Sequence, residues 1–155
     1  MKIVERAGEV AVPRDFVFRY VADHRNVPAW MFGVTEFRPR GTPESGAGSV
    51  FVMTFTNPIA TTELELHAVE WRDDAVIELR STRKPLVTAR FEFETTAAGA
   101  TRIRVRIGYP PATGAAGLVT NPLGDLIAAT AVRHVETTLR REVTAAFHTD
   151  ESTQS

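Results

Sequence analysis

The chain has 155 residues, of which 43% are hydrophobic, and a formal net charge of −1. That length and apolar fraction suffice for one domain with its own core, and they exclude a disordered chain. The near-neutral charge argues against general binding of nucleic acid, and the absence of cysteine excludes disulfides, thiolate metal sites and a cysteine nucleophile.

The N-terminal region alternates short elements. Residues 3–12 are typical of a strand, and a helix begins at Pro13 with an apolar stripe on one side. Asn26 can cap a second short helix that ends at Gly33. Charged residues interrupt the first ten positions and no apolar run is long enough to cross a membrane. We therefore expect a cytoplasmic protein without a signal peptide or a membrane span.

From Val34 onwards the apolar period changes to two, which predicts six further strands. They cover residues 34–38, 50–56, 61–71, 75–81, 86–95 and 101–109. Turn-forming pairs separate them, namely Asn57-Pro58, Asp73-Asp74, Lys84-Pro85 and Ala98-Gly99.

One parity of these strands is apolar, and the other carries charge. Glutamates and arginines fill the polar parity of residues 86–95 and 101–109, which predicts a solvated outer face with ion pairs between strands. In residues 61–71 the apolar parity changes after Ala68, which predicts a β-bulge there.

A long helix follows, with Asn121 as its N-cap, Pro122 as its first residue and an end near Phe147. In its first half one face is formed by Leu123, Ile127, Thr130, His134 and Thr138. A face that is partly polar in its middle favours a helix that closes over a cavity. The polar residues 149–155 are expected to form a disordered tail, so the single domain is expected to span residues 1–148.

This order of elements, the run from Pro13 to Phe18 and the motif Asp23-His24-Arg25-Asn26-Val27-Pro28-Ala29-Trp30 resemble the START-like helix-grip (SRPBCC) superfamily, nearest its polyketide cyclase/dehydrase branch. The resemblance covers nearly the whole chain. It implies an α+β helix-grip fold, in which a curved seven-stranded antiparallel sheet wraps around a long C-terminal helix, with two short helices after the first strand. It also implies an apolar cavity between sheet and helix, whereas the chemistry of that cavity varies within the family.

Strand parity and helix phase select the side chains expected to line this cavity. They are Trp30, Phe51, Met53, Phe55, Ser81, Phe91, Phe93, Ile107, Ile127, Thr130 and Thr138. We expect His134 to be the principal polar contact and Tyr109 to add a hydroxyl donor, with a plain structural role open for both. His24 is either part of the pocket mouth or a solvated loop residue, and Arg83 is either a cation at the mouth or a surface residue.

Two functions stay open at this point. A cyclase, aromatase or dehydratase acting on a polyketide-like substrate would use His134 as general acid or base and Tyr109 as hydrogen-bond donor. A lipid-binding or transport protein for an apolar small molecule needs only the cavity and a gate. The spacing of the histidines and the lack of a nucleotide-binding glycine motif predict neither a metal nor an organic cofactor. The expected partner is an apolar small molecule, and the protein is expected to be a monomer or a homodimer.

Overall fold

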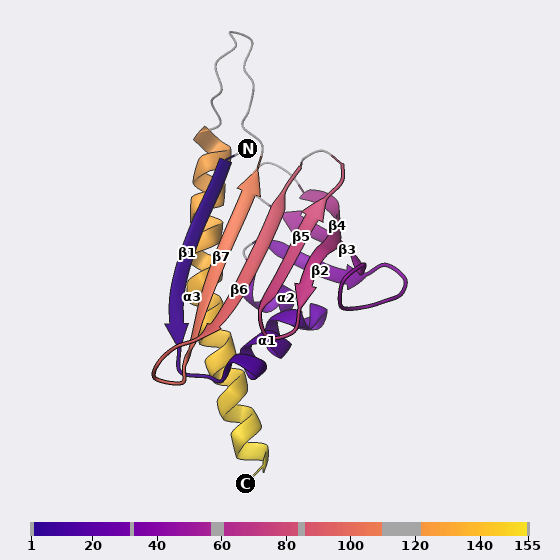
Figure 1. Cartoon of the computed structure of the whole chain (residues 1–155). Helices are drawn as coiled ribbons and strands as arrows, with labels where there is room; N and C mark the ends of the chain where they lie inside the picture. Colours follow the sequence, from indigo (N-terminus) through magenta and orange to yellow (C-terminus); the bar gives the residue numbers. More distant parts are fainter. Residues whose placement is uncertain (1, 32, 57–60, 84–85, 110–121, 155) are drawn as a thin grey trace.

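One antiparallel sheet of seven strands organises the chain, in the order β1-β7-β6-β5-β4-β3-β2 (Figure 1). The computed structural model describes residues 2–31, 33–56, 61–83, 86–109 and 122–154, without the side chains of 122–131 and 154. The strands are β1 (Lys2–Val10), β2 (Val34–Pro39), β3 (Val50–Thr56), β4 (Thr61–Arg72), β5 (Val76–Ser81), β6 (Thr88–Thr95) and β7 (Thr101–Tyr109). The chain passes from β2 to β7 through neighbouring strands, and β1 pairs with β7 at the far edge.

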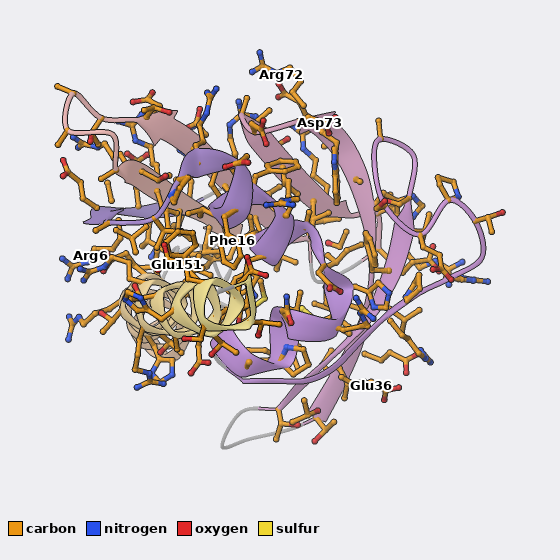
Figure 2. All side chains as sticks on the ribbon, turned by 90° about the horizontal axis from the view of Figure 1, so that it is seen from below. Arg6, Phe16, Glu36, Arg72, Asp73 and Glu151 are labelled. Atoms are coloured by element: carbon orange, nitrogen blue, oxygen red, sulfur yellow. The ribbon has the colours of Figure 1, made fainter. Side chains whose placement is uncertain are left out.

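The helices lie against one face of this sheet. They are α1 (Arg14–Ala22), the 3-10 turn η1 (His24–Asn26), α2 (Val27–Trp30) and α3 (Pro122–Gln154). Helix α3 runs beside β1 and β7, and α1 and α2 lie near one end of the sheet (Figure 1). Seen from below, Phe16 of α1 lies next to the C-terminal half of α3, where its ring meets that of Phe147 edge-on at 5.1 Å (Figure 2). The predicted helix-grip fold is therefore confirmed.

Several predicted features of the strands are confirmed to the residue. Strands β3 and β7 have the expected bounds, and α3 begins at Pro122. The pairing of β4 with β5 shifts between Ala68 and Glu70, which is the predicted β-bulge. Because of this bulge, Trp71 pairs with Ile77, which lies in the apolar core. The predicted cap Asn121 and the turn pairs Asn57-Pro58 and Lys84-Pro85 lie outside the described residues.

The C-terminal end of the chain differs from the prediction. Helix α3 continues to Gln154, so residues 149–154 are helical where a disordered tail was expected. The hydroxyl groups of Thr149 and Thr153 donate hydrogen bonds to the carbonyls of Ala145 and Thr149, one turn earlier in the helix. Each threonine therefore bonds within the helix rather than breaking it. None of the helices in the described part of the chain is long and apolar enough to cross a membrane.

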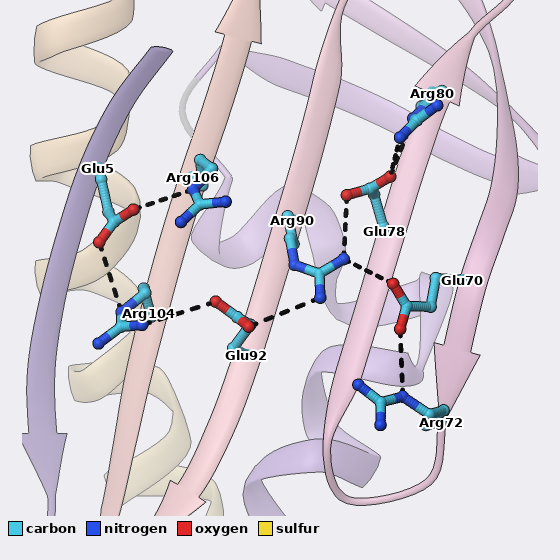
Figure 3. A network of polar contacts seen from close by, with 9 residues as sticks. All are labelled: Glu5, Glu70, Arg72, Glu78, Arg80, Arg90, Glu92, Arg104 and Arg106. Carbon is cyan, nitrogen blue, oxygen red and sulfur yellow. Dashed lines mark hydrogen bonds and ion pairs between the residues drawn. The ribbon is translucent and has the colours of Figure 1, made fainter.

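The outer face of the sheet carries a continuous set of ion pairs across five strands, which we term the outer-face network (Figure 3). Its members are Glu5, Glu70, Arg72, Glu78, Arg80, Arg90, Glu92, Arg104 and Arg106. At its centre Arg90 Nη1 lies 2.7 Å from Glu70 Oε1 and 3.1 Å from Glu78 Oε1. Glu92 faces Arg104 across the β6–β7 pair, which confirms the predicted pairing of charges between strands.

Candidate functional site

The inner face of the sheet, which α1, α2 and α3 cover, is the candidate site. Its apolar side chains are tightly packed at one end and only half-buried at the other. Phe51, Phe91 and Phe93 belong to the packed end and are almost completely buried. There Phe51 stacks on Phe37 with ring centres 4.9 Å apart, and Phe93 meets Phe18 edge-on at 5.5 Å. The packed end therefore has less accessible apolar surface than the half-buried end.

The packed end contains a small cavity of about 20 Å³, which we term the inner hollow. It lies between the sheet and the segment formed by η1 and α2, and its described lining includes Trp30, Met31, Phe51, Trp71 and Phe91. The Trp30 ring stands edge-on against Phe91, with centres 5.4 Å apart. A space of this size holds about one water molecule.

Two residues that carry polar groups, Trp30 and His24, line the inner hollow. The indole nitrogen Nε1 of Trp30 is buried and has no hydrogen-bond partner among the residues that the structure describes. The ring of His24 lies 6.4 Å from that of Phe51, and the residue is half-buried. His24 therefore lines the hollow on one side and a surface groove on the other, as a residue at the mouth of a pocket would.

The other end of the inner face has five half-buried side chains, four on β1, β6 and β7 and one in the segment just before β6, which we term the half-buried patch. Its members are Val4, Val87, Ala89, Ile107 and Tyr109. Ile107 pairs with Val4 on one side and with Ala89 on the other, so the patch is continuous. Ile107 also has the same strand parity as Val105, which is fully buried. The patch therefore points inwards and still keeps accessible apolar surface.

The predicted inward position of His134 is wrong, because its side chain is exposed. The stripe of α3 that packs on the sheet consists of Val132, Val135, Leu139 and Val143, all of which are buried. At about 100° per residue, His134 points roughly 140° away from the centre of this stripe. Residues 127 and 130, which we predicted on the same face as His134, have side chains outside the described part.

The remaining predicted site residues divide between packing and hydrogen bonding. Met53 and Thr138 are buried, and Phe55 is half-buried beside Gly33, where a Cβ would come 2.5 Å from its ring. The Ser81 hydroxyl accepts a hydrogen bond from the Val87 amide at 2.8 Å and so ties the end of β5 to the chain before β6. Arg83 is exposed, as in the surface interpretation.

The structure therefore brings the predicted residues together in two groups. Trp30, Phe51 and Phe91 surround the inner hollow, whereas Ile107 and Tyr109 belong to the half-buried patch. Sequence reasoning missed Trp71 as a lining residue, although the predicted bulge would have turned it inwards. Among the residues that the structure describes, no three His, Asp or Glu side chains gather as a metal site would require.

The comparisons with known proteins agree with this architecture. The family described as polyketide cyclase/dehydrase and lipid transport matches residues 1–146. A START superfamily protein from Mycobacterium smegmatis superposes with a TM-score of 0.75 at 13% identity, covering 93% of this chain and 98% of that one. No curated protein sequence matches the chain.

Two further solved structures are similar over nearly their full length. The Zhui aromatase/cyclase from Streptomyces sp. R1128 has a TM-score of 0.71 at 18% identity, covering 92% of this chain and 93% of that one. A protein from Thermus thermophilus has a TM-score of 0.70 at 17% identity, covering 94% of this chain and 99% of that one. At these identities the likeness shows a shared fold and nothing about the ligand.

Proposed function

Because this chain belongs to the polyketide cyclase/dehydrase and lipid transport family, we propose that it binds an apolar small molecule against the inner face of its sheet. The observation that carries the proposal is the half-buried patch. Ile107, Ala89 and Val4 point towards the interior and still keep accessible surface. Covering apolar surface stabilises a complex by about 25 cal/mol for each Å² removed from water. The binding of an apolar ligand that covers this patch is therefore favoured by the surface that it removes from water.

The small size of the inner hollow supports binding at the patch. The inner hollow has a volume of about 20 Å³, whereas sites for small-molecule ligands commonly have roughly 300–1,000 Å³. The bulk of a ligand therefore lies along the patch, and only a small group can enter the hollow without displacing its walls. Tyr109 stands at the edge of the patch and supplies a hydroxyl for a polar group of the ligand.

The experiment compares two isoleucines on opposite faces of neighbouring strands. Ile107→Trp fills the patch, whereas Ile3→Trp adds the same bulk at a position that is 60% exposed on the outer parity of β1. The probe is N-phenyl-1-naphthylamine, a neutral dye whose fluorescence rises in apolar surroundings. We expect wild-type protein and Ile3→Trp to bind the dye equally well, and Ile107→Trp to bind it at least about tenfold more weakly. Equal binding by all three, or none by the wild type, would overturn the proposal.

Cyclisation or dehydration of a carbonyl-rich ligand is the second candidate function, and Tyr109 favours it. Such a reaction needs a shaped apolar surface and one or two groups that move protons or stabilise an enolate. His134 is exposed and is not carried forward in that role. If the protein catalyses such a reaction through Tyr109, Tyr109→Phe loses turnover of a poly-β-keto thioester and keeps its affinity for the dye. Unchanged turnover in this variant would contradict the role of Tyr109.

A further inference from the structure

Trp30 places a buried hydrogen-bond donor in the core. The residue is 2% exposed, and within the described part of the chain its Nε1 has no hydrogen-bond partner. An indole nitrogen can only donate, so the missing partner is an acceptor. Buried donors without acceptors are uncommon in folded proteins, because their desolvation is not offset by a hydrogen bond. This donor therefore marks a position where an acceptor is missing.

The surroundings of Trp30 define what that acceptor can be. The residue lines the inner hollow, whose volume of about 20 Å³ has room for one oxygen atom with its substituents and little more. The described lining contains apolar side chains, the two tryptophans and His24, and it contains no carboxylate. The site therefore suits a neutral oxygen, such as that of a carbonyl group, a hydroxyl group or water.

The inner hollow lies close to the half-buried patch and next to a groove on the surface. Trp30 packs on Phe91, which is two residues from Ala89 of the half-buried patch on the same side of β6. Ala22, His24 and Trp71 line both the hollow and a surface groove of about 480 Å³. These three side chains form the wall between the hollow and solvent.

We propose that Trp30 Nε1 and the inner hollow form a subsite for a single oxygen acceptor, supplied either by the ligand or by a water that passes His24. The ligand arm rests on the proposed function, since it needs an apolar molecule on the half-buried patch. The subsite selects ligands with a carbonyl or hydroxyl oxygen over hydrocarbons of the same shape, because only the former satisfy the indole donor.

The test uses two probes that differ in one group. 2-Acetylnaphthalene carries a carbonyl where 2-isopropenylnaphthalene carries a methylene group of similar shape. The chain has two tryptophans, so its proton–nitrogen spectrum has two indole signals, and Trp71→Phe assigns them. We expect the acetyl probe to move the Trp30 signal downfield and the isopropenyl probe to leave it in place. Trp30→Phe should bind the acetyl probe about fivefold more weakly and the isopropenyl probe about equally.

The alternative in which water supplies the acceptor is tested on the protein alone, without a probe. If water supplies the acceptor, the Trp30 indole proton shows a cross-peak to a bound water in free protein. His24→Ala should then raise the rate at which the Trp30 indole proton exchanges with deuterium, whereas His67→Ala on the outer face should not. If Trp30→Phe fails to fold, the indole signal of wild-type protein still decides between the arms.

The outcomes separate this subsite from the proposed function. A Trp30 signal that responds to neither probe and shows no water cross-peak overturns the subsite. If both probes bind and move that signal alike, the proposed ligand binding is supported, and the proposed preference of the subsite for ligands with an oxygen is overturned. If neither probe binds at all, the proposed function fails, and the water cross-peak alone decides the subsite.

Discussion

Gly8 of β1 lies directly against the carboxylate of Glu136 on α3. A Cβ at position 8 would collide with Glu136 Oε1 and come within 3.1 Å of Arg140 Nε. Glu136 is nearly buried, and its Oε1 lies 2.5 Å from Arg140 Nε. A strand residue without a side chain thus makes room for an ion pair within α3 that lies against the sheet.

Adding one methyl group at this contact should destabilise the fold. Gly8→Ala is expected to lower the free energy of unfolding by about 1–3 kcal/mol, because the Glu136 carboxylate must move from its place beside Arg140. Urea unfolding measures this cost. In a Glu136→Ala background the same change should cost less than about 1 kcal/mol, since the colliding atoms are gone. Equal costs in both backgrounds would show that the contact is not the cause.

The phase of α3 can be tested with two residues five positions apart. Leu139 is fully buried and His134 is exposed. We expect Leu139→Ala to lower the free energy of unfolding by about 2–5 kcal/mol, and His134→Ala to change it by less than about 1 kcal/mol. His134→Ala should also leave dye binding unchanged. A large loss of either quantity in that variant would restore the inward position that the sequence suggested.

Arg90 should matter more for stability than an exposed arginine with an equally short ion pair. Its side chain is 20% exposed and lies near Glu70, Glu78 and Glu92, so Arg90→Met leaves three carboxylates close to one another. We expect a loss of about 1–3 kcal/mol in the free energy of unfolding. Arg25 is 78% exposed and pairs with Asp23 at 2.8 Å, so Arg25→Met should cost less than about 1 kcal/mol. Similar losses in the two variants would contradict this ranking.

The same network makes stability depend on pH in a defined direction. The hydrogen bond from Arg90 holds the pKa of Glu70 below its ordinary value. A carboxyl group whose pKa is lower in the folded state stabilises the fold above its unfolded pKa of about 4.3. That contribution is lost as the pH falls through the lower folded-state pKa. Urea unfolding from about pH 7 down to about pH 3 should therefore show wild-type protein and Arg90→Met approaching each other in acid.

A second carboxyl group provides the control for this pH series. A hydrogen bond from His67, together with Arg40, lowers the pKa of Glu65, and both partners remain in Arg90→Met. The variant should therefore keep part of its acid-induced loss of stability. A difference between wild type and variant that stays constant across the series would show that Glu70 does not titrate as described.

The faces of the strands were determined by the sequence alone. In β7, Ile103 and Val105 alternate with Arg102 and Arg104, and the structure buries the first pair and turns the second outwards. The loss of alternation after Ala68 likewise predicted the bulge. A strand has two faces and a period of two, so local hydrophobicity is sufficient to assign them.

The face of α3 was decided only by tertiary structure. A helix can turn any of its sides towards the sheet. Two sides of α3 contain both apolar and polar residues, so the periodicity of the sequence does not show which of them is buried. Next to the buried stripe lies Glu136, which is also buried and whose place depends on Gly8, a residue 128 positions earlier in the chain. The missing acceptor of Trp30 is likewise a property of the side chains packed around it. Such contacts cannot be predicted from the local sequence, because they form only when distant segments pack together.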